Sequence, residues 1–155
     1  MLNVVKDEKD GILTVIMSGA VEENAHFEDL IGEPTGLVVL NTKGVTRINS
    51  VGVKNWIKYF EGRVKKGAKL KFVECSTAIV EQVNLISNFT CGGEVESLYV
   101  PFVCEDCGAE LVGCFKAEAI KAANFEIPNL KCTKCGSENA VFDDLPDEYF
   151  NFLMN

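Results

Sequence analysis

Four of the seven cysteines have the spacing of a metal site. They form two C-x-x-C pairs, Cys104/Cys107 and Cys132/Cys135, with 24 residues between the pairs. Both pairs are followed by glycine, and the heptapeptides C-E-D-C-G-A-E and C-T-K-C-G-S-E form a short internal repeat. Two tight turns of this kind present four thiolates to one ion, which suits tetrahedral Zn²⁺. The glycine permits the positive φ that closes such a turn. Since two such turns supply the four ligands of one tetrahedral ion, we predict one zinc ion.

Two other interpretations of these thiols are an iron site and a redox dithiol. The second pair lacks the C-P-x-C sequence of iron-binding rubredoxins, and two matched pairs favour one shared ion, so zinc is preferred. Four thiolates leave no position for water, so the ion is predicted to be structural and not catalytic. The remaining cysteines, Cys75, Cys91 and Cys114, are expected to be small apolar residues of the core.

Charge and composition exclude several classes of function. The chain has 155 residues and a net charge of −8, of which −2 falls in residues 1–98 and −6 in residues 99–155. A net charge of −6 in residues 99–155 argues against binding of nucleic acid, which requires a basic surface. The single histidine, His26, excludes a multi-histidine metal centre and is expected at the surface. No apolar run reaches the length of a membrane span, and charges at positions 6–10 argue against a signal peptide, so we expect a cytoplasmic protein.

The hydrophobic pattern of the first hundred residues predicts an α/β domain. Two early strands followed by alternating helices and strands imply a mixed, mostly parallel sheet covered by helices. In the clearest helix, 51–64, Lys54 and Arg63 belong to the polar face. The apolar stripe is formed by Val53, Trp56, Ile57, Phe60 and Val64. Glu22 and Glu23 are expected to stabilise the first helix electrostatically. The predicted elements are strands 2–5 and 12–18, helix 21–31, strand 36–40 (buried on both faces), a turn at 42–44, helix 51–64, strand 70–74, a helix capped by Ser76 or Thr77, and strand 94–102.

The cysteine-rich part resembles a zinc ribbon, a small β-rich unit with each C-x-x-C turn at the tip of a hairpin. Its predicted strands are 98–103, 111–115, 125–130 and 140–142. The aromatic tail is predicted to form a helix that docks back on the protein. We therefore expect three parts, residues 1–98, 99–142 and 143–155, without a flexible linker between the first two.

Residues 1–98 resemble a STAS domain, the fold of bacterial anti-sigma-factor antagonists. The resemblance rests on the strand L-V-V-L after Gly36, the segment G-V-T-R-I-N-S-V-G-V at 44–53, the following helix, and K-G-A-K-L-K-F-V at 66–73. The family's central motif is an Asp-Ser-Ser-Gly-like loop whose first serine is the phosphoacceptor. The resemblance therefore implies a phosphoacceptor at Ser50 and places Gly52 on the glycine of the motif. Asn49 replaces the acidic residue of the motif and Val51 replaces its second serine.

The physical setting of Ser50 leaves two interpretations. It precedes an amphipathic helix, so we place it at the N-cap, where a phosphate would meet unpaired N–H groups. Alternatively, Ser50 only caps the helix and Asn49 completes the turn. Arg47 is either a surface charge or a contact for a partner or anion near Ser50. The candidate partner-binding residues are Arg47, Asn49, Ser50, Val51, Gly52 and Lys54.

The resemblance implies a non-enzymatic regulatory module. It would bind a protein partner, such as an anti-sigma-factor kinase or a sensory complex, through the surface around Ser50, and would be a monomer or weak dimer. One alternative is a cysteine-based redox or metal-handling protein. Another is a STAS relative that binds a small anionic ligand, although no G-x-x-x-x-G-K-[ST] phosphate loop is present.

Overall fold

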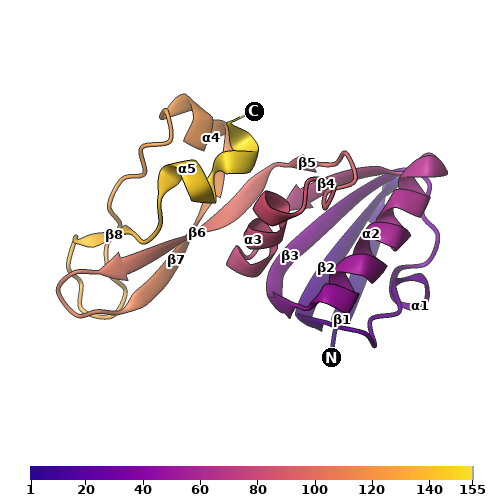
Figure 1. Ribbon diagram of the computed structural model, residues 1–155, viewed down its shortest axis with the longest axis horizontal. Helices are drawn as coiled ribbons and strands as arrows, with labels where there is room; N and C mark the ends of the chain where they lie inside the picture. Colours follow the sequence, from indigo (N-terminus) through magenta and orange to yellow (C-terminus); the bar gives the residue numbers. More distant parts are fainter. Residues whose placement is uncertain (155) are drawn as a thin grey trace.

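A five-stranded sheet forms the larger part of the protein, whose computed structural model describes residues 1–154. Its strand order is β1-β2-β3-β4-β5, and only the β1–β2 pair is antiparallel. Helices α1, α2 and α3 lie together on one face of this sheet (Figure 1), which confirms the predicted fold class. The strands are β1 (Asn3–Lys9), β2 (Ile12–Val21), β3 (Leu37–Ile48), β4 (Lys69–Val73) and β5 (Glu94–Val95), and the helices are α1 (Phe27–Ile31), α2 (Ser50–Lys65) and α3 (Thr77–Leu85).

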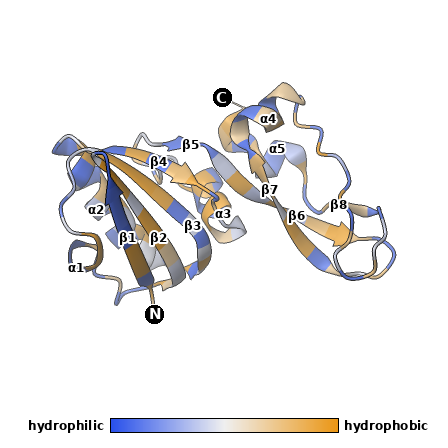
Figure 2. Ribbon diagram, turned by 180° about the vertical axis from the view of Figure 1, so that it is seen from behind, coloured by the Kyte–Doolittle hydropathy of each residue, from blue (hydrophilic) through white to orange (hydrophobic). Residues whose placement is uncertain are grey.

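Among the described residues 1–154, no helix covers the opposite face of the sheet. Seen from behind, the strands lie in front of the helices and alternate between apolar and polar residues (Figure 2). Val38 and Leu40 of β3 face the helices and are buried, whereas Val39 between them is only half-buried. The prediction that this strand is buried on both faces is therefore wrong, because helices cover one side only.

The first hairpin follows directly from its turn residues. Asp10 and Gly11 join β1 to β2, and both have positive φ, 54° and 79°. A D-G pair adopts this backbone readily, and such a turn matches the twist of the strands it connects. The charged residues before the turn therefore extend β1 to Lys9 and do not form a loop.

Trp56 is at the centre of the core between α2 and the sheet. Its indole stacks on Phe89 with ring centroids 4.7 Å apart, and Nε1 donates to the Phe89 carbonyl oxygen at 3.0 Å. Phe60 contacts it edge-on at 4.9 Å. Burying an indole without a partner for its N–H would leave a donor unsatisfied, so the Phe89 carbonyl permits complete burial of this side chain.

A second, antiparallel sheet has the order β7-β6-β8. We call residues 97–142 the ribbon and residues 143–154 the C-terminal segment. Strand β6 begins beside the first sheet, where Leu98 forms a single bridge with Cys75, and extends outward into the ribbon (Figure 1). The elements are β6 (Ser97–Cys104), β7 (Glu110–Lys116), α4 (Ala117–Ala122), β8 (Ala140–Phe142), α5 (Pro146–Tyr149) and a 3₁₀ turn, η1 (Asn151–Leu153).

The C-terminal segment docks back on the protein, where it contacts strand β6 of the second sheet and helix α3, which covers the first sheet. The Tyr149 hydroxyl donates to the Tyr99 carbonyl oxygen of β6 at 2.6 Å. Asn84 of α3 donates to the Tyr149 carbonyl oxygen at 2.8 Å and accepts from Phe152 N at 3.0 Å. Tyr149 and Phe150 are buried. The single helix predicted for this tail is thus a short helix followed by a 3₁₀ turn.

Several element boundaries differ from the predictions. Strand β3 continues through the predicted turn at 42–44, because Gly44 allows β2 to approach: a Cβ there would lie 2.6 Å from Ser18 Cβ. That pairing also keeps residues 19–21 extended, so α1 begins only at Phe27. In the ribbon, 125–130 is not a strand apart from one bridge at Leu130. The alanine-rich sequence before it forms α4, which we did not predict.

Two further departures concern α2 and the chain after it. Arg63, predicted on the polar face, is buried and lies 3.7 Å from Glu33, while Val64 is exposed. The helix turns this face inward because Tyr59 packs under α1 and donates to the Gly32 carbonyl oxygen at 2.5 Å. The predicted strand 94–102 is divided between the two sheets, with β5 in the first and β6 in the second.

Candidate metal centre and partner-binding surface

The two C-x-x-C turns, or knuckles, share one backbone pattern. Gly108 N donates to the Cys104 carbonyl oxygen at 2.8 Å, and Gly136 N donates to that of Cys132 at 3.0 Å. Both glycines have positive φ, 76° and 78°. This is the conformation for which we expected glycine at these positions, so the repeated heptapeptides form the same turn twice.

The knuckles bring their four thiols to one point. The four Sγ atoms all lie within 4.8 Å of one another. Two contacts of 3.6 Å join sulfurs of different knuckles, Cys104 to Cys135 and Cys107 to Cys132. Four thiolates around one zinc at about 2.3 Å would have sulfurs about 3.8 Å apart. The four cysteines are therefore close enough to hold a metal ion.

Backbone N–H groups favour the thiolate form at this point. Lys134 N and Cys135 N point at the Cys132 sulfur, at 3.4 and 3.5 Å. These N–H groups, that of Cys135 first, lower the pKa of the Cys132 thiol to about 6. A thiolate is the form that ligates a metal, so the turn prepares Cys132 as a ligand.

Asp106 ties the two knuckles together, a role the sequence analysis did not identify. Its carboxylate accepts hydrogen bonds from the Ser137 hydroxyl and, at 3.0 Å, from the Asn139 side-chain amide. The hydrogen bond from Ser137, followed by that from Asn139, lowers the pKa of Asp106. The C-x-x-C spacing identifies the cysteines from the sequence. No such rule identifies Asp106, because its hydrogen-bond partners are 31 and 33 residues away along the chain.

The other three cysteines differ from one another. Cys75 is fully buried, as predicted, and burial raises the pKa of its thiol to about 12. Cys91 is half-buried, and its Sγ lies 3.8 Å from the Ile57 carbonyl oxygen. Cys114 is exposed. Its prediction as a core residue is wrong, because alternate residues of β7 point away from the ribbon's apolar face.

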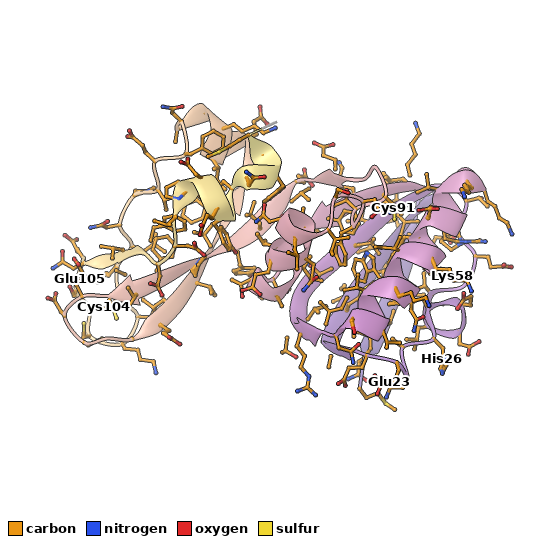
Figure 3. The ribbon with its side chains drawn as sticks, viewed as in Figure 1. Glu23, His26, Lys58, Cys91, Cys104 and Glu105 are labelled. Atoms are coloured by element: carbon orange, nitrogen blue, oxygen red, sulfur yellow. The ribbon has the colours of Figure 1, made fainter. Side chains whose placement is uncertain are left out.

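The second candidate site is the start of α2, which lies far from the knuckles. Glu23 is near this helix terminus, whereas Cys104 and Glu105 are at the outer end of the ribbon (Figure 3). Asn49 is the N-cap, and its side-chain oxygen accepts from Gly52 N at 2.8 Å. Ser50 is the first helical residue and is exposed. Our placement of Ser50 at the N-cap is therefore wrong by one residue.

Gly52 occupies a position where a larger residue does not fit. A Cβ atom at this site would lie 2.2 Å from the Val21 carbonyl oxygen. The end of β2 therefore packs directly on the first turn of α2. Asn49 N also donates to that carbonyl oxygen at 3.1 Å, which fixes the entry of the chain into the helix.

Glu22 and Glu23 contact this loop and not the first helix. Glu22 lies 3.3 Å from Arg47 in an exposed ion pair. Glu23 accepts from the Asn49 side-chain amide at 2.9 Å, and this hydrogen bond lowers the pKa of Glu23. Both contacts depend on the pairing of Val21 with Ile48. Our expectation that these carboxylates serve α1 is therefore wrong.

The surface around Ser50 adds apolar and basic groups to the carboxylates of Glu22 and Glu23. Val51 is 45% exposed, and Lys54 and Arg47 are also exposed. His26 is exposed as well and serves as the residue before α1, which agrees with its predicted place at the surface. Exposed side chains on a rigid helix terminus are available for contact with another molecule.

Comparison with known proteins gives structural neighbours but no relative in sequence. No family model matches the chain, and no curated protein matches it. The fold is similar to the crystal structure of an anti-sigma factor antagonist from Mycobacterium paratuberculosis. The TM-score is 0.48 at 19% sequence identity, over 61% of this chain and 86% of the other. Among residues 1–154, no helix combines the length and the apolar character needed to cross a membrane.

Proposed function

We propose that this chain is a non-enzymatic regulatory module that binds a protein partner through the surface around Ser50. The partner would be an anti-sigma-factor kinase or a comparable sensory complex, as the sequence resemblance implies. The observation that carries the proposal is that, at the start of α2, Asn49 is the N-cap and Ser50 is an exposed residue of the first turn. Because Asn49 caps the helix, the exposed Ser50 hydroxyl is not needed for folding and is free for modification.

Phosphorylation of Ser50 would change this surface sharply. A phosphate adds about −1.5 to −2 charges at neutral pH. It would lie at the positive end of α2, one turn before Lys54, and both features favour a negative charge there. The same group would sit beside exposed Val51 and convert a partly apolar surface into an anionic one. A partner that binds the unmodified surface would then be released.

The test compares four forms of the full chain: wild type, Ser50→Asp, Ser50→Ala and the control Thr35→Asp. Thr35 is also exposed but lies in the segment before β3, near the C-terminal end of α2 and not at its start. A partner captured from the native lysate is purified and its affinity is measured for each form. We expect Ser50→Asp to weaken binding at least about tenfold, or about 1.4 kcal/mol. Ser50→Ala and Thr35→Asp should stay within about twofold of the wild type. Equal affinities for all four forms would refute the switch.

We further propose that the knuckles hold one structural zinc ion. The 3.6 Å contacts between sulfurs of different knuckles support a shared ion. A redox dithiol would instead use two cysteines of one C-x-x-C turn. With zinc bound, the four thiolates and Asp106 would fasten the two turns to each other, and ligand binding would be linked to folding of this end of the ribbon.

Metal analysis and thiol titration test this assignment. The purified chain should contain about one zinc per molecule and little iron. In the native state the four knuckle thiols should resist a thiol reagent, and a chelator should expose all four with loss of β-structure signal. The control Cys114→Ser should keep the metal and lower the reactive thiols by one. Complete metal loss with an unchanged circular dichroism spectrum would contradict a structural role, and rapid reversible oxidation of the knuckle thiols would favour the redox alternative.

A further inference from the structure

A cavity of about 720 Å³ lies where the two sheets of the protein meet. Helix α3, strand β5, helix α4 and the C-terminal segment converge around it (Figure 1). The volume falls within the roughly 300–1,000 Å³ that small-molecule sites occupy. The cavity is distinct from both the knuckles and the start of α2, since none of their residues line it.

The cavity combines charges of both signs with apolar groups. The lysines are Lys116 at the end of β7 and Lys121 in α4; the glutamates are Glu94 and Glu96 around β5 and Glu118 in α4. All five residues are exposed. None of the three ion pairs found among residues 1–154 includes any of them, so these lysines and glutamates line one space without direct ion pairs.

Apolar side chains supply the remainder of the lining that matters for recognition. Ile86 follows α3, Val95 is in β5 and Phe152 is in η1; all three are half-buried. Phe152 is held in place because its N–H donates to Asn84 at 3.0 Å. The lining thus offers cations for a carboxylate, carboxylates for an ammonium group, and an apolar wall for a hydrocarbon side chain.

We propose that this cavity binds a small zwitterion with an apolar side chain, of the free amino acid or short peptide class. The lysines would contact its carboxylate and the glutamates its ammonium group. The proposal does not depend on the partner-binding role of Ser50. Because both sheets contribute to the cavity, a bound ligand would also stabilise the folded chain by mass action.

The experiment uses the zinc-loaded full chain and the dipeptide leucyl-leucine as probe. Binding is measured by calorimetry and by backbone amide NMR shifts, at ligand concentrations up to about 10 mM. We expect saturable binding of one dipeptide, with the largest shifts around Glu96, Lys116 and Phe152. The doubly capped analogue N-acetyl-leucyl-leucine amide lacks both charges and should bind at least about tenfold more weakly.

Charge-reversal variants locate the site. Lys121→Glu should raise the Kd for leucyl-leucine at least about tenfold. The control is Lys58→Glu, at an exposed residue of helix α2 (Figure 3), and it should leave the Kd for leucyl-leucine unchanged. Absence of binding by the wild type would overturn the proposal. Equal binding of the capped analogue, or equal affinity of Lys121→Glu and wild type, would overturn it as well.

Discussion

The assignment of the helix cap to Asn49, and not to Ser50, can be tested by two single substitutions. Asn49→Ala removes the hydrogen bond at 2.8 Å from Gly52 N. The loss of an N-cap side chain costs about 0.5–2 kcal/mol, with about 1 kcal/mol typical. Asn49→Ala also removes the 2.9 Å hydrogen bond to Glu23. This second contact is exposed, so it should add little to the loss.

Ser50→Ala should behave differently, because Ser50 follows the cap and its side chain is exposed. We expect a change within about ±0.5 kcal/mol, as for surface substitutions in general. Asn49→Ser keeps a capping oxygen and should recover most of the stability lost in Asn49→Ala. The order of stability should therefore be wild type and Ser50→Ala, then Asn49→Ser, then Asn49→Ala.

Urea unfolding of the full chain measures these differences. Trp56 is the only tryptophan, and it is buried beneath α2, so its fluorescence reports the unfolding of the N-terminal core. For a chain of this size, about 1 kcal/mol corresponds to a change of about 2–4 °C in Tm. If Ser50→Ala were as destabilising as Asn49→Ala, Ser50 would take part in capping. The Ser50 hydroxyl would then be needed for folding and would not be free for modification.

Two further predictions concern the C-terminal segment and the thiols. Asn84→Ala removes the hydrogen bonds at 2.8 and 3.0 Å that hold this segment on α3. It should lower the free energy of unfolding by about 1–3 kcal/mol and increase amide exchange at Tyr149. The control Asn88→Ala, at an exposed residue, should change neither quantity. In the native chain Cys114 should react first with a thiol reagent and Cys75 last, because burial raises the pKa of Cys75 to about 12 and keeps the thiol protonated over pH 7–9. Reaction of Cys75 as fast as Cys114 at pH 8 would show that the core opens readily.

Local pattern identified the features that need few neighbours. The apolar helix around Trp56 formed as predicted, and Ser76, one of the two predicted caps, caps α3. The repeated cysteine spacing also placed four thiols together. In each case the residues that matter lie close in sequence or repeat a known turn, so propensity and spacing contain the information.

Other features required partners from distant parts of the chain. The sequence predicts Arg63 at the surface, because a charged side chain is usually exposed. Its burial depends on the packing of α1 and the position of Glu33, which the local sequence does not show. Gly44 reads as a turn residue, but it serves the close approach of Ser18. Cys114 reads as apolar filler, yet the register of β7 directs it outward. Register and crossing geometry set these outcomes, and neither is encoded in a short window.

The sequence by itself determined the α/β class, the cysteine pairs and the acidic character of residues 99–155. These properties depend on composition, on hydrophobic period and on spacing over a few residues. Tertiary structure alone decided that Asn49 caps α2, that Glu22 and Glu23 serve that loop, and that Asp106 joins the knuckles. It also decided that lysines and glutamates from separate segments line one cavity. The physical reason is that hydrogen bonds and charges act over a few ångströms in space, whatever the separation along the chain.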